Sequence, residues 1–237
     1  MEKKHVILII LIITSGIFYY LLTEQSQSQE TSVRVTRVID GDTFEIENSE
    51  KVRMKGINTP EKNMPGYEEA KTFLRNIIEN QSIEIVSYGA DKYNRILAYA
   101  FLNGQNINEE ILKQGLATLY YYEEDEFYND MKKAEGEARK NELGIWEKSQ
   151  DENCLKIIQL KYEEPNERCT NGEILEIKNN CDKTISITLK DDATHIYDII
   201  FKPQETYKEN FSCIWNDDGD SLYAWDRDGK LILFYRY

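Results

Sequence analysis

One short stretch of the chain concentrates side chains that could act on a phosphodiester. Asp40 and Asp42 flank a glycine, Arg53 follows in a run of alternating character, and Glu61 comes soon after it. Carboxylates can ligate a hard metal ion or take a proton from water, and an arginine can hold a phosphate with two donors. Asp-Gly turns are also common as purely structural features. A second arginine, Arg95, lies in a predicted turn downstream and favours the chemical interpretation.

The elements around these residues are predicted to be short strands. Asp-Gly between apolar runs indicates a tight turn, which places Asp40 and Asp42 where two strands meet. On the next strand, alternation puts Arg53 and Lys55 on the face opposite Val52 and Met54. Strands are predicted at 32–39, 43–47, 50–57, 83–87 and 96–102, and helices at 67–80, after a cap at Asn108, and at 126–141. Five short strands with a helix after the third predict a small barrel of the OB type.

Five sequence blocks, in order, resemble the thermonuclease family of staphylococcal-nuclease-like calcium nucleases. They are IDGDT at 39–43, R-x4-NTPE at 53–61, DKYNR at 91–95, QGLA at 114–117 and LGIW at 143–146. The resemblance covers residues 31–148. It implies an OB-fold barrel that hydrolyses phosphodiester bonds of DNA or RNA.

The resemblance also implies a calcium site. The side chains of Asp42 and Asn58 and the carbonyl of Thr59 would hold the ion. Asp40 would contact these ligands without contacting the ion itself. The best-known members of the family carry Asp where this chain has Asn58. An amide contributes no formal charge, so a weak calcium site is expected. The alternative is a non-catalytic nucleic-acid-binding protein whose metal site has been weakened.

By the same resemblance, Glu61 would be the general base, and Arg53 and Arg95 would clamp the phosphate and stabilise the transition state. Tyr93 and Tyr121 are candidates for stacking on bases or contacting phosphates, although in a chain with 16 tyrosines both could be structural. Because Asp42, Arg53, Glu61 and Arg95 are all present, a catalytic nuclease is favoured over a protein that only binds nucleic acid.

Charge and histidine content limit the alternatives. The formal net charge of −14 argues against polyanion binding by bulk electrostatics, but residues 31–102 carry 10 Lys and Arg against 11 Asp and Glu, so a small basic cleft remains compatible. The two histidines, His5 and His195, lie outside the nuclease-like half, which excludes a histidine-dependent centre within it. The acidic run at 123–126 is predicted to be a solvated loop rather than a metal site.

The N-terminus predicts a membrane anchor. Residues 6–22 form a charge-free, mostly apolar run preceded by lysines, so the remainder of the chain is expected outside the cytoplasm. A cleaved signal peptide is the alternative, and the protein would then be secreted, but no small-x-small cleavage site follows. Residues 1–30 are therefore assigned to an anchor and polar tether.

Residues 153–237 are predicted to form a second, all-β domain. Strands are expected at 155–160, 174–178, 185–189, 196–201, 221–225 and 231–237, which is typical of a small immunoglobulin-like sandwich. The runs EILEIKNN, TLKDD and IWNDDGDSLYAWDRDGKL resemble the lamin-tail domain, although ISI at 185–187 departs from that family's usual Gly-Trp. No catalytic constellation is evident here, so a binding or positioning module with an unknown protein partner is expected.

The acidic turns and the cysteines of the second domain each leave an alternative open. Its DDGD and DRDG runs are predicted to be hairpin turns, with calcium binding as the alternative. Export favours two disulfides over a zinc site, with three possible pairings. The cysteines are Cys154, Cys169, Cys181 and Cys213.

Overall fold

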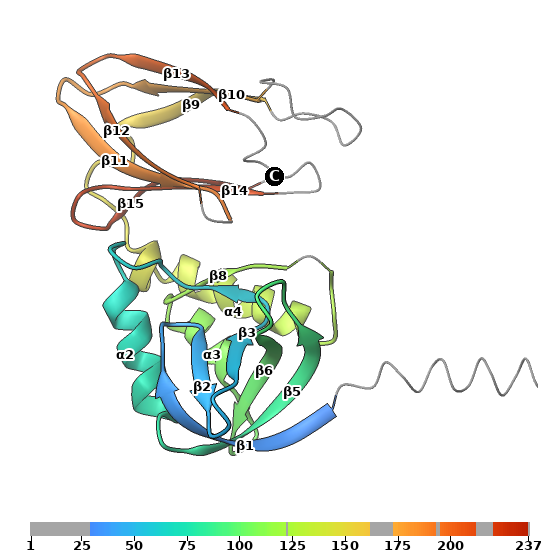
Figure 1. Ribbon diagram of the computed structural model, residues 1–237. Coiled ribbons are helices and arrows are strands. Elements are labelled where there is room, and N and C mark those ends of the chain that lie inside the picture. Colours follow the sequence, from blue (N-terminus) through green and yellow to red (C-terminus); the bar gives the residue numbers. More distant parts are fainter. Residues whose placement is uncertain (1–28, 122, 162–172, 193–194, 212–219, 237) are drawn as a thin grey trace, which may run out of the picture.

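The computed structural model describes residues 29–121, 123–161, 173–192, 195–211 and 220–236 (Figure 1). The apolar run at 6–22 lies outside them, so the predicted anchor remains a prediction. Among the residues that are described, no helix is long and apolar enough to cross a membrane.

The first half is a closed, mainly antiparallel barrel, as predicted. Its sheet has the order β3-β2-β1-β5-β6-β7, and a parallel pairing of β3 with β6 closes it. The short strands β4 and β8 pair beside this barrel. The bounds are β1 Gln29–Val38, β2 Thr43–Ile46, β3 Lys51–Met54, β4 Ile57–Asn58, β5 Ser82–Ala90, β6 Ile96–Leu102, β7 Gln105–Asn106 and β8 Thr118–Leu119. The first strand begins two residues before the predicted domain boundary.

Three α-helices and one 3-10 turn complete this half. They are α2 Tyr67–Ile78, α3 Ile107–Lys113, α4 Tyr128–Lys140 and η1 Gly144–Trp146. Helix α2 buries Ala70, Leu74 and Ile78 at helical spacing, so it covers the barrel with one apolar face. Leu74, Ile78 and the inward strand residues share one continuous core.

The prediction that Asn108 caps α3 was wrong. The cap is Asn106, whose side chain accepts a hydrogen bond from the Glu109 amide at 3.2 Å. Asn108 is fully buried instead, where it accepts from the Ala100 amide at 3.0 Å and donates to the Lys55 carbonyl at 2.8 Å. Both residues are Asn, so composition alone did not separate the cap from the buried cross-link.

The second half is a two-sheet sandwich. One sheet has the order β13-β10-β9 and the other β12-β11-β14-β15, and their apolar faces share a core. The bounds are β9 Leu155–Lys161, β10 Glu173–Asn179, β11 Ile185–Lys190, β12 Ile196–Phe201, β13 Thr206–Phe211, β14 Ser221–Trp225 and β15 Leu231–Arg236. Strand β13 was missed because it is a polar edge strand, largely exposed before Phe211, and carries little apolar alternation.

A disulfide joins Cys154 to Cys181 and staples the start of β9 to the end of β10. One of the predicted bonds is therefore present in place of a zinc site. Cys169 and Cys213 lie outside the described residues, as does most of the DDGD run. The DRDG run is the predicted hairpin turn, in which the Asp226 carboxylate accepts from the amides of Asp228 and Lys230, each at 2.9 Å.

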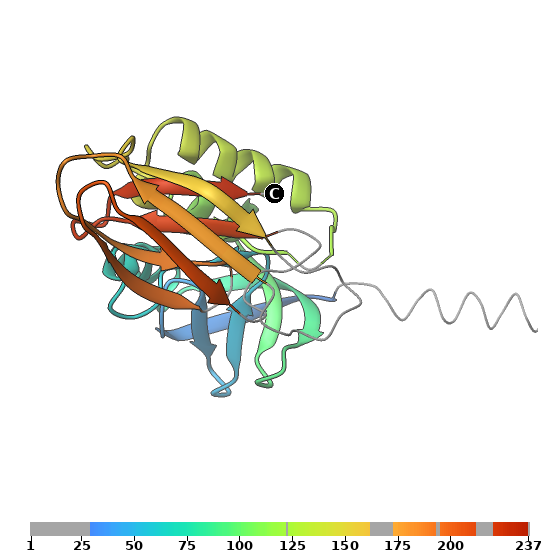
Figure 2. The ribbon, with the colours of Figure 1, turned by 90° about the horizontal axis from the view of Figure 1, so that it is seen from above.

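The sandwich packs against the end of the barrel domain that carries β8 and η1 (Figures 1 and 2). A third core, shared by the two domains, lies at this junction. It joins α4 and η1 to β14 and β15. Its buried members are Ala138, Ile145, Trp146, Tyr223, Trp225 and Leu231.

Candidate active site

The turn between β1 and β2 places the first two carboxylates at the rim of the barrel. The amides of Ile39 and Asp40 both donate to the Thr43 carbonyl, at 2.9 and 3.2 Å, and the Met54 amide donates to the Asp42 carbonyl at 2.9 Å. Gly41 is required by close packing, because a Cβ there would lie 2.8 Å from the Thr59 hydroxyl oxygen. The turn is thus pressed against the chain that follows β4.

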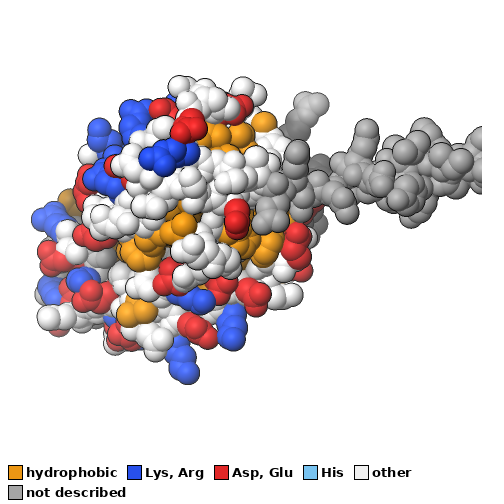
Figure 3. All heavy atoms as spheres, turned by 90° about the horizontal axis from the view of Figure 1, so that it is seen from below, with side chains coloured by type: hydrophobic (Ala, Val, Ile, Leu, Met, Phe, Trp, Pro, Cys, Tyr) orange, Lys and Arg blue, Asp and Glu red, His pale blue; other side chains and the backbone are white. Residues whose placement is uncertain are grey.

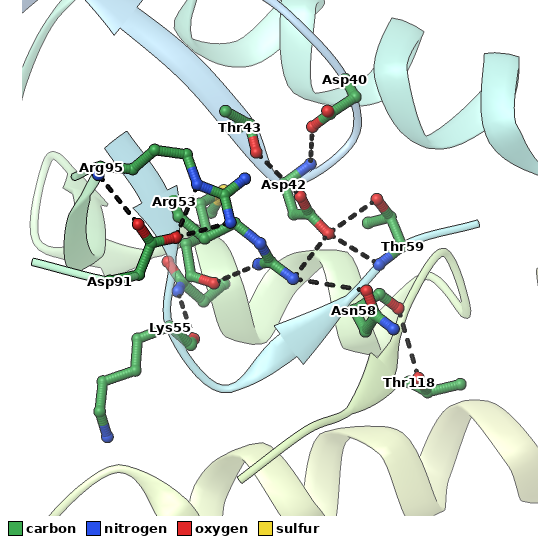
Figure 4. A network of polar contacts seen from close by, with 12 residues as sticks. Asp40, Asp42, Thr43, Arg53, Lys55, Asn58, Thr59, Asp91, Arg95 and Thr118 are labelled. Carbon is green, nitrogen blue, oxygen red and sulfur yellow. Dashed lines mark hydrogen bonds and ion pairs between the residues drawn. The ribbon is translucent and has the colours of Figure 1, made fainter. Parts of the chain in front are cut away.

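Asp42 is the centre of the polar network in Figure 4 and is nearly buried. Its Oδ2 accepts from the Thr59 amide at 2.9 Å and from the Thr59 hydroxyl at 3.0 Å, while Oδ1 accepts from the Thr43 hydroxyl at 3.1 Å. These bonds fix the carboxylate in one orientation. Arg53 Nη2 lies 3.2 Å from the same Oδ2.

The Arg53 guanidinium lies between two oxygens that the family resemblance assigns to a metal ion. Its Nη2 contacts Asp42 Oδ2 at 3.2 Å and Asn58 Oδ1 at 3.4 Å, and Nη1 donates to the Met54 carbonyl at 2.6 Å. A cation is therefore already accommodated between these oxygens. Carboxylate, amide and carbonyl oxygens are the hard donors that calcium takes, so the residues present fit that ion.

Asp40 lies behind Asp42 and accepts a hydrogen bond from its amide at 3.3 Å. Burial first, and then the negative charge of Asp42, raise the pKa of Asp40 to about 6. The two carboxylates therefore resist being charged together. A nearby cation would relieve that repulsion.

Arg95 is held beside this network by an acidic partner in its own turn. Asp91 Oδ2 accepts from Arg95 Nε at 2.7 Å and pairs with Nη2 at 2.6 Å, a two-point contact. Asp91 Oδ1 accepts from the backbone amides of Tyr93 and Arg95, each at 2.9 Å, which shapes the turn. In Figure 4 the Arg95 side chain extends from this turn toward Arg53.

The remaining predicted site residues have different surroundings. Glu61 is exposed in the turn after β4, and among the described residues its carboxylate accepts no side-chain hydrogen bond. Tyr93 is 68% exposed, and its ring lies 5.4 Å from the Arg95 guanidinium. Tyr121 is half-buried, with its hydroxyl bonded to that of Tyr99. Its ring packs where a Cβ on Gly56 would lie, so Tyr121 has a structural role in addition to any role in binding.

The acidic run at 123–126 is not simply a solvated loop. The Lys55 ammonium pairs with Asp125, and it lies 4.8, 5.5 and 5.0 Å from the ring centres of Tyr88, Tyr99 and Tyr121. The strand alternation that placed Arg53 also placed Lys55 on its face, but nothing local to Asp125 identified its partner. The described part of the chain contains no cluster of three His, Cys, Asp or Glu side chains suited to a metal.

Sequence reasoning also missed a contact from the second domain. Asn58 Nδ2 donates to the backbone carbonyl of Asp192 at 3.0 Å, across 134 residues of sequence. Lys190, the buried last residue of β11, is a positive charge close enough to Glu61 for the two to interact electrostatically. The sandwich therefore lies directly beside the predicted ligand and base.

Basic and acidic side chains are mixed on the end of the barrel domain that faces away from the sandwich. On the face seen from below in Figure 3, Lys and Arg side chains are interspersed with Asp and Glu side chains. A groove next to the Asp40 turn is lined by Arg37, Lys71, Arg75 and Glu79. Arg37 also pairs with Glu45 at 3.0 Å and Arg75 lies 3.9 Å from Glu79, so ion pairs partly neutralise the three cations of this groove.

Comparison with known proteins places the first half in a defined group. The profile of the staphylococcal nuclease homologues matches residues 51–148. The chain is 36% identical over 129 residues to the thermonuclease of Staphylococcus intermedius, covering 49% of this chain and 77% of the relative. It is 35% identical to endonuclease YncB of Bacillus subtilis, covering 54% and 68%. An uncharacterized endonuclease of Haemophilus influenzae is 28% identical, covering 65% and 86%.

Proposed function

The chain belongs to the staphylococcal nuclease family, and from this membership we propose that it is a calcium-dependent endonuclease that hydrolyses DNA or RNA outside the cytoplasm. The observation that carries this proposal is the convergence of Asp42, Arg53, Asn58 and Thr59 at one end of the barrel, with Arg95 extending toward them. A site built only to bind a polyanion does not need a buried carboxylate at its centre. The proposed metal, base and clamps each have a matching side chain.

The proposed ion would be held by Asp42, by the Asn58 side-chain oxygen and by the Thr59 carbonyl. When bound, calcium would supply positive charge to the phosphate oxygens and help orient the attacking water. Glu61 would take the proton from that water, for which an exposed carboxylate is suited whose oxygens accept no side-chain hydrogen bond within the described part of the chain. The water oxygen would form a new P–O bond as the P–O bond to the leaving sugar oxygen breaks, and that oxygen would take up a proton from solvent.

Arg53 and Arg95 would stabilise the negative charge that builds on the phosphate. Each guanidinium already makes contacts that hold it in place: Arg53 with Asp42 and Arg95 with Asp91. Fixed donors stabilise a transition state without having to reorganise during the reaction. The groove lined by Arg37, Lys71 and Arg75 would accept the phosphate backbone beyond the cleaved bond.

Location and the second domain are part of the proposal. The apolar run at 6–22 would anchor the protein, with both domains outside the cytoplasm, and the Cys154–Cys181 disulfide supports an oxidising compartment. External protease added to intact cells should digest both domains if this orientation holds. The two-sheet sandwich supports the likeness to lamin-tail domains, and its role would be to position the nuclease.

The test is cleavage of denatured DNA and of RNA by the full chain, with calcium or with a chelator. We expect products with calcium, none with chelator, and cleavage slower by ~100-fold or more from a Glu61→Gln variant with calcium. Binding of the same nucleic acids without cleavage would instead support the alternative of a non-catalytic binding protein. Cleavage in chelator would refute the calcium site.

A further inference from the structure

The two domains share a buried, specific interface rather than a loose contact. Tyr223 and Trp225 of β14 stack with ring centres 5.4 Å apart and pack with Trp146 and Ile145 of the barrel domain. The Trp225 indole donates to the Ile145 carbonyl at 2.9 Å. The Leu231 amide donates to the Glu147 carbonyl at 2.7 Å. Direct backbone bonds of this kind fix the position of the sandwich.

A buried ion pair extends this interface to the strand next to the site. Arg236 of β15 contacts both carboxylate oxygens of Glu135 in α4, at 2.6 and 3.1 Å. Glu135 is 1% exposed, and its Oε1 also accepts from the Leu119 amide of β8 at 2.8 Å. Leu119 pairs with Ile57 in β4, the strand that carries Asn58. The sandwich is thus connected to Asn58 through three consecutive contacts.

Asn58 also contacts the sandwich directly, because its side-chain amide both accepts and donates a hydrogen bond. Its Oδ1 accepts from Arg53 within the site, while its Nδ2 donates to the Asp192 carbonyl at 3.0 Å. The Asp192 loop is itself fixed, because the Asp192 amide donates to Asp220 at 3.0 Å and its carboxylate accepts from Tyr223 at 2.6 Å. An aspartate at position 58 would place a carboxylate oxygen against that carbonyl and could not donate.

We propose that Asn58 is an interdomain contact as well as a proposed calcium ligand, so that the sandwich forms a fixed wall of the nuclease site. The amide at this position is then required by docking, which an aspartate would weaken. Only the ligand role rests on the proposed function; the docking role depends on the hydrogen bond to Asp192. Calcium binding at the proposed site and docking of the sandwich therefore both depend on the Asn58 side chain.

The test compares hydrogen exchange in the full-length parent and the Asn58→Asp variant, both in chelator. We expect interface amides of the segment 145–149 and of β14 and β15 to exchange at least ~10-fold faster in the variant, since a part-buried carbonyl loses its donor and faces a carboxylate oxygen instead. The matched control is Asn103→Asp, which adds the same charge in the exposed Asn-Gly hairpin turn after β6. It should leave these amides unchanged.

Calcium titrations of the same proteins separate the two roles of Asn58. A carboxylate adds ligand charge, so Asn58→Asp should lower the calcium midpoint of cleavage by ~10-fold or more if position 58 is a ligand. Faster interface exchange with an unchanged calcium midpoint would support the docking role and would show that residue 58 is not a calcium ligand. Parental exchange rates in Asn58→Asp would overturn the proposal whatever the midpoint. If that variant does not fold, Asn58→Ala should loosen the interface without added charge, and parental exchange there is equally decisive.

Discussion

The ion pair between Arg236 and Glu135 gives the strongest stability prediction. Replacing Arg236 with methionine leaves the Glu135 carboxylate buried, and among the described residues the Leu119 amide remains as its hydrogen-bond donor. Breaking a buried pair by removing one partner costs ~3–5 kcal/mol. The Arg236 side chain is 30% exposed, so we expect the lower end, about 3 kcal/mol. In a chain of this size that corresponds to a fall in Tm of roughly 6–12 °C.

Thermal and urea unfolding of the full chain in chelator would measure this loss. Arg34→Met is the matched control, because Arg34 pairs with Glu47 at 3.6 Å with both side chains more than half exposed, and such pairs contribute only ~0–1 kcal/mol. The double variant Glu135→Gln with Arg236→Met should recover most of the loss, since no unpaired buried charge remains and the glutamine oxygen can still accept from Leu119. A Tm for Arg236→Met equal to that of Arg34→Met would refute the reasoning.

Three further predictions concern the site and the disulfide. Arg53→Lys and Arg95→Lys should each lower single-turnover cleavage by ~100-fold or more, because lysine keeps the charge but loses the planar pair of donors; rates near the parent in both would remove the clamp assignment. Glu61→Gln should lower kcat by ~100-fold or more while the calcium midpoint of nucleic-acid binding is unchanged; a shifted midpoint would make Glu61 a ligand instead of a base. Replacing Cys154 and Cys181 with alanine should lower the free energy of unfolding by about 3.5 kcal/mol in urea, and an unchanged midpoint would show that the bond does not constrain the unfolded chain.

The elements that the sequence predicted well are those set by local chemistry. The Asp-Gly turn is where the sequence placed it, and alternation along β3 correctly separated Arg53 from the buried Val52 and Met54. Strand periodicity succeeded because one face of each barrel strand is buried and the other is not. The same reasoning placed Lys55 on the face of Arg53 but could not supply its partner Asp125, which lies 70 residues away.

Where the sequence misled, tertiary contacts had overridden local pattern. Asn106 and Asn108 are chemically equivalent candidates for a helix cap, and the choice between them depended on which side chain the barrel buries. Strand β13 has little apolar alternation, and pairing with β10 is what makes it a strand. The disulfide pairing likewise depended on the fold, which brings Cys154 to Cys181 across 27 residues.

Asn58 shows why the role of a residue cannot be inferred from its type alone when its hydrogen-bond partners are unknown. From the sequence alone, Asn58 is interpreted as a metal ligand without the charge of the family's usual Asp, and weaker calcium binding is the expected consequence. The structure adds the Asp192 carbonyl, to which an amide can donate and a carboxylate cannot. Without that carbonyl, an aspartate here would lose no hydrogen bond to the second domain. The asparagine is therefore better explained by the domain that it contacts than by decay of the site that it belongs to.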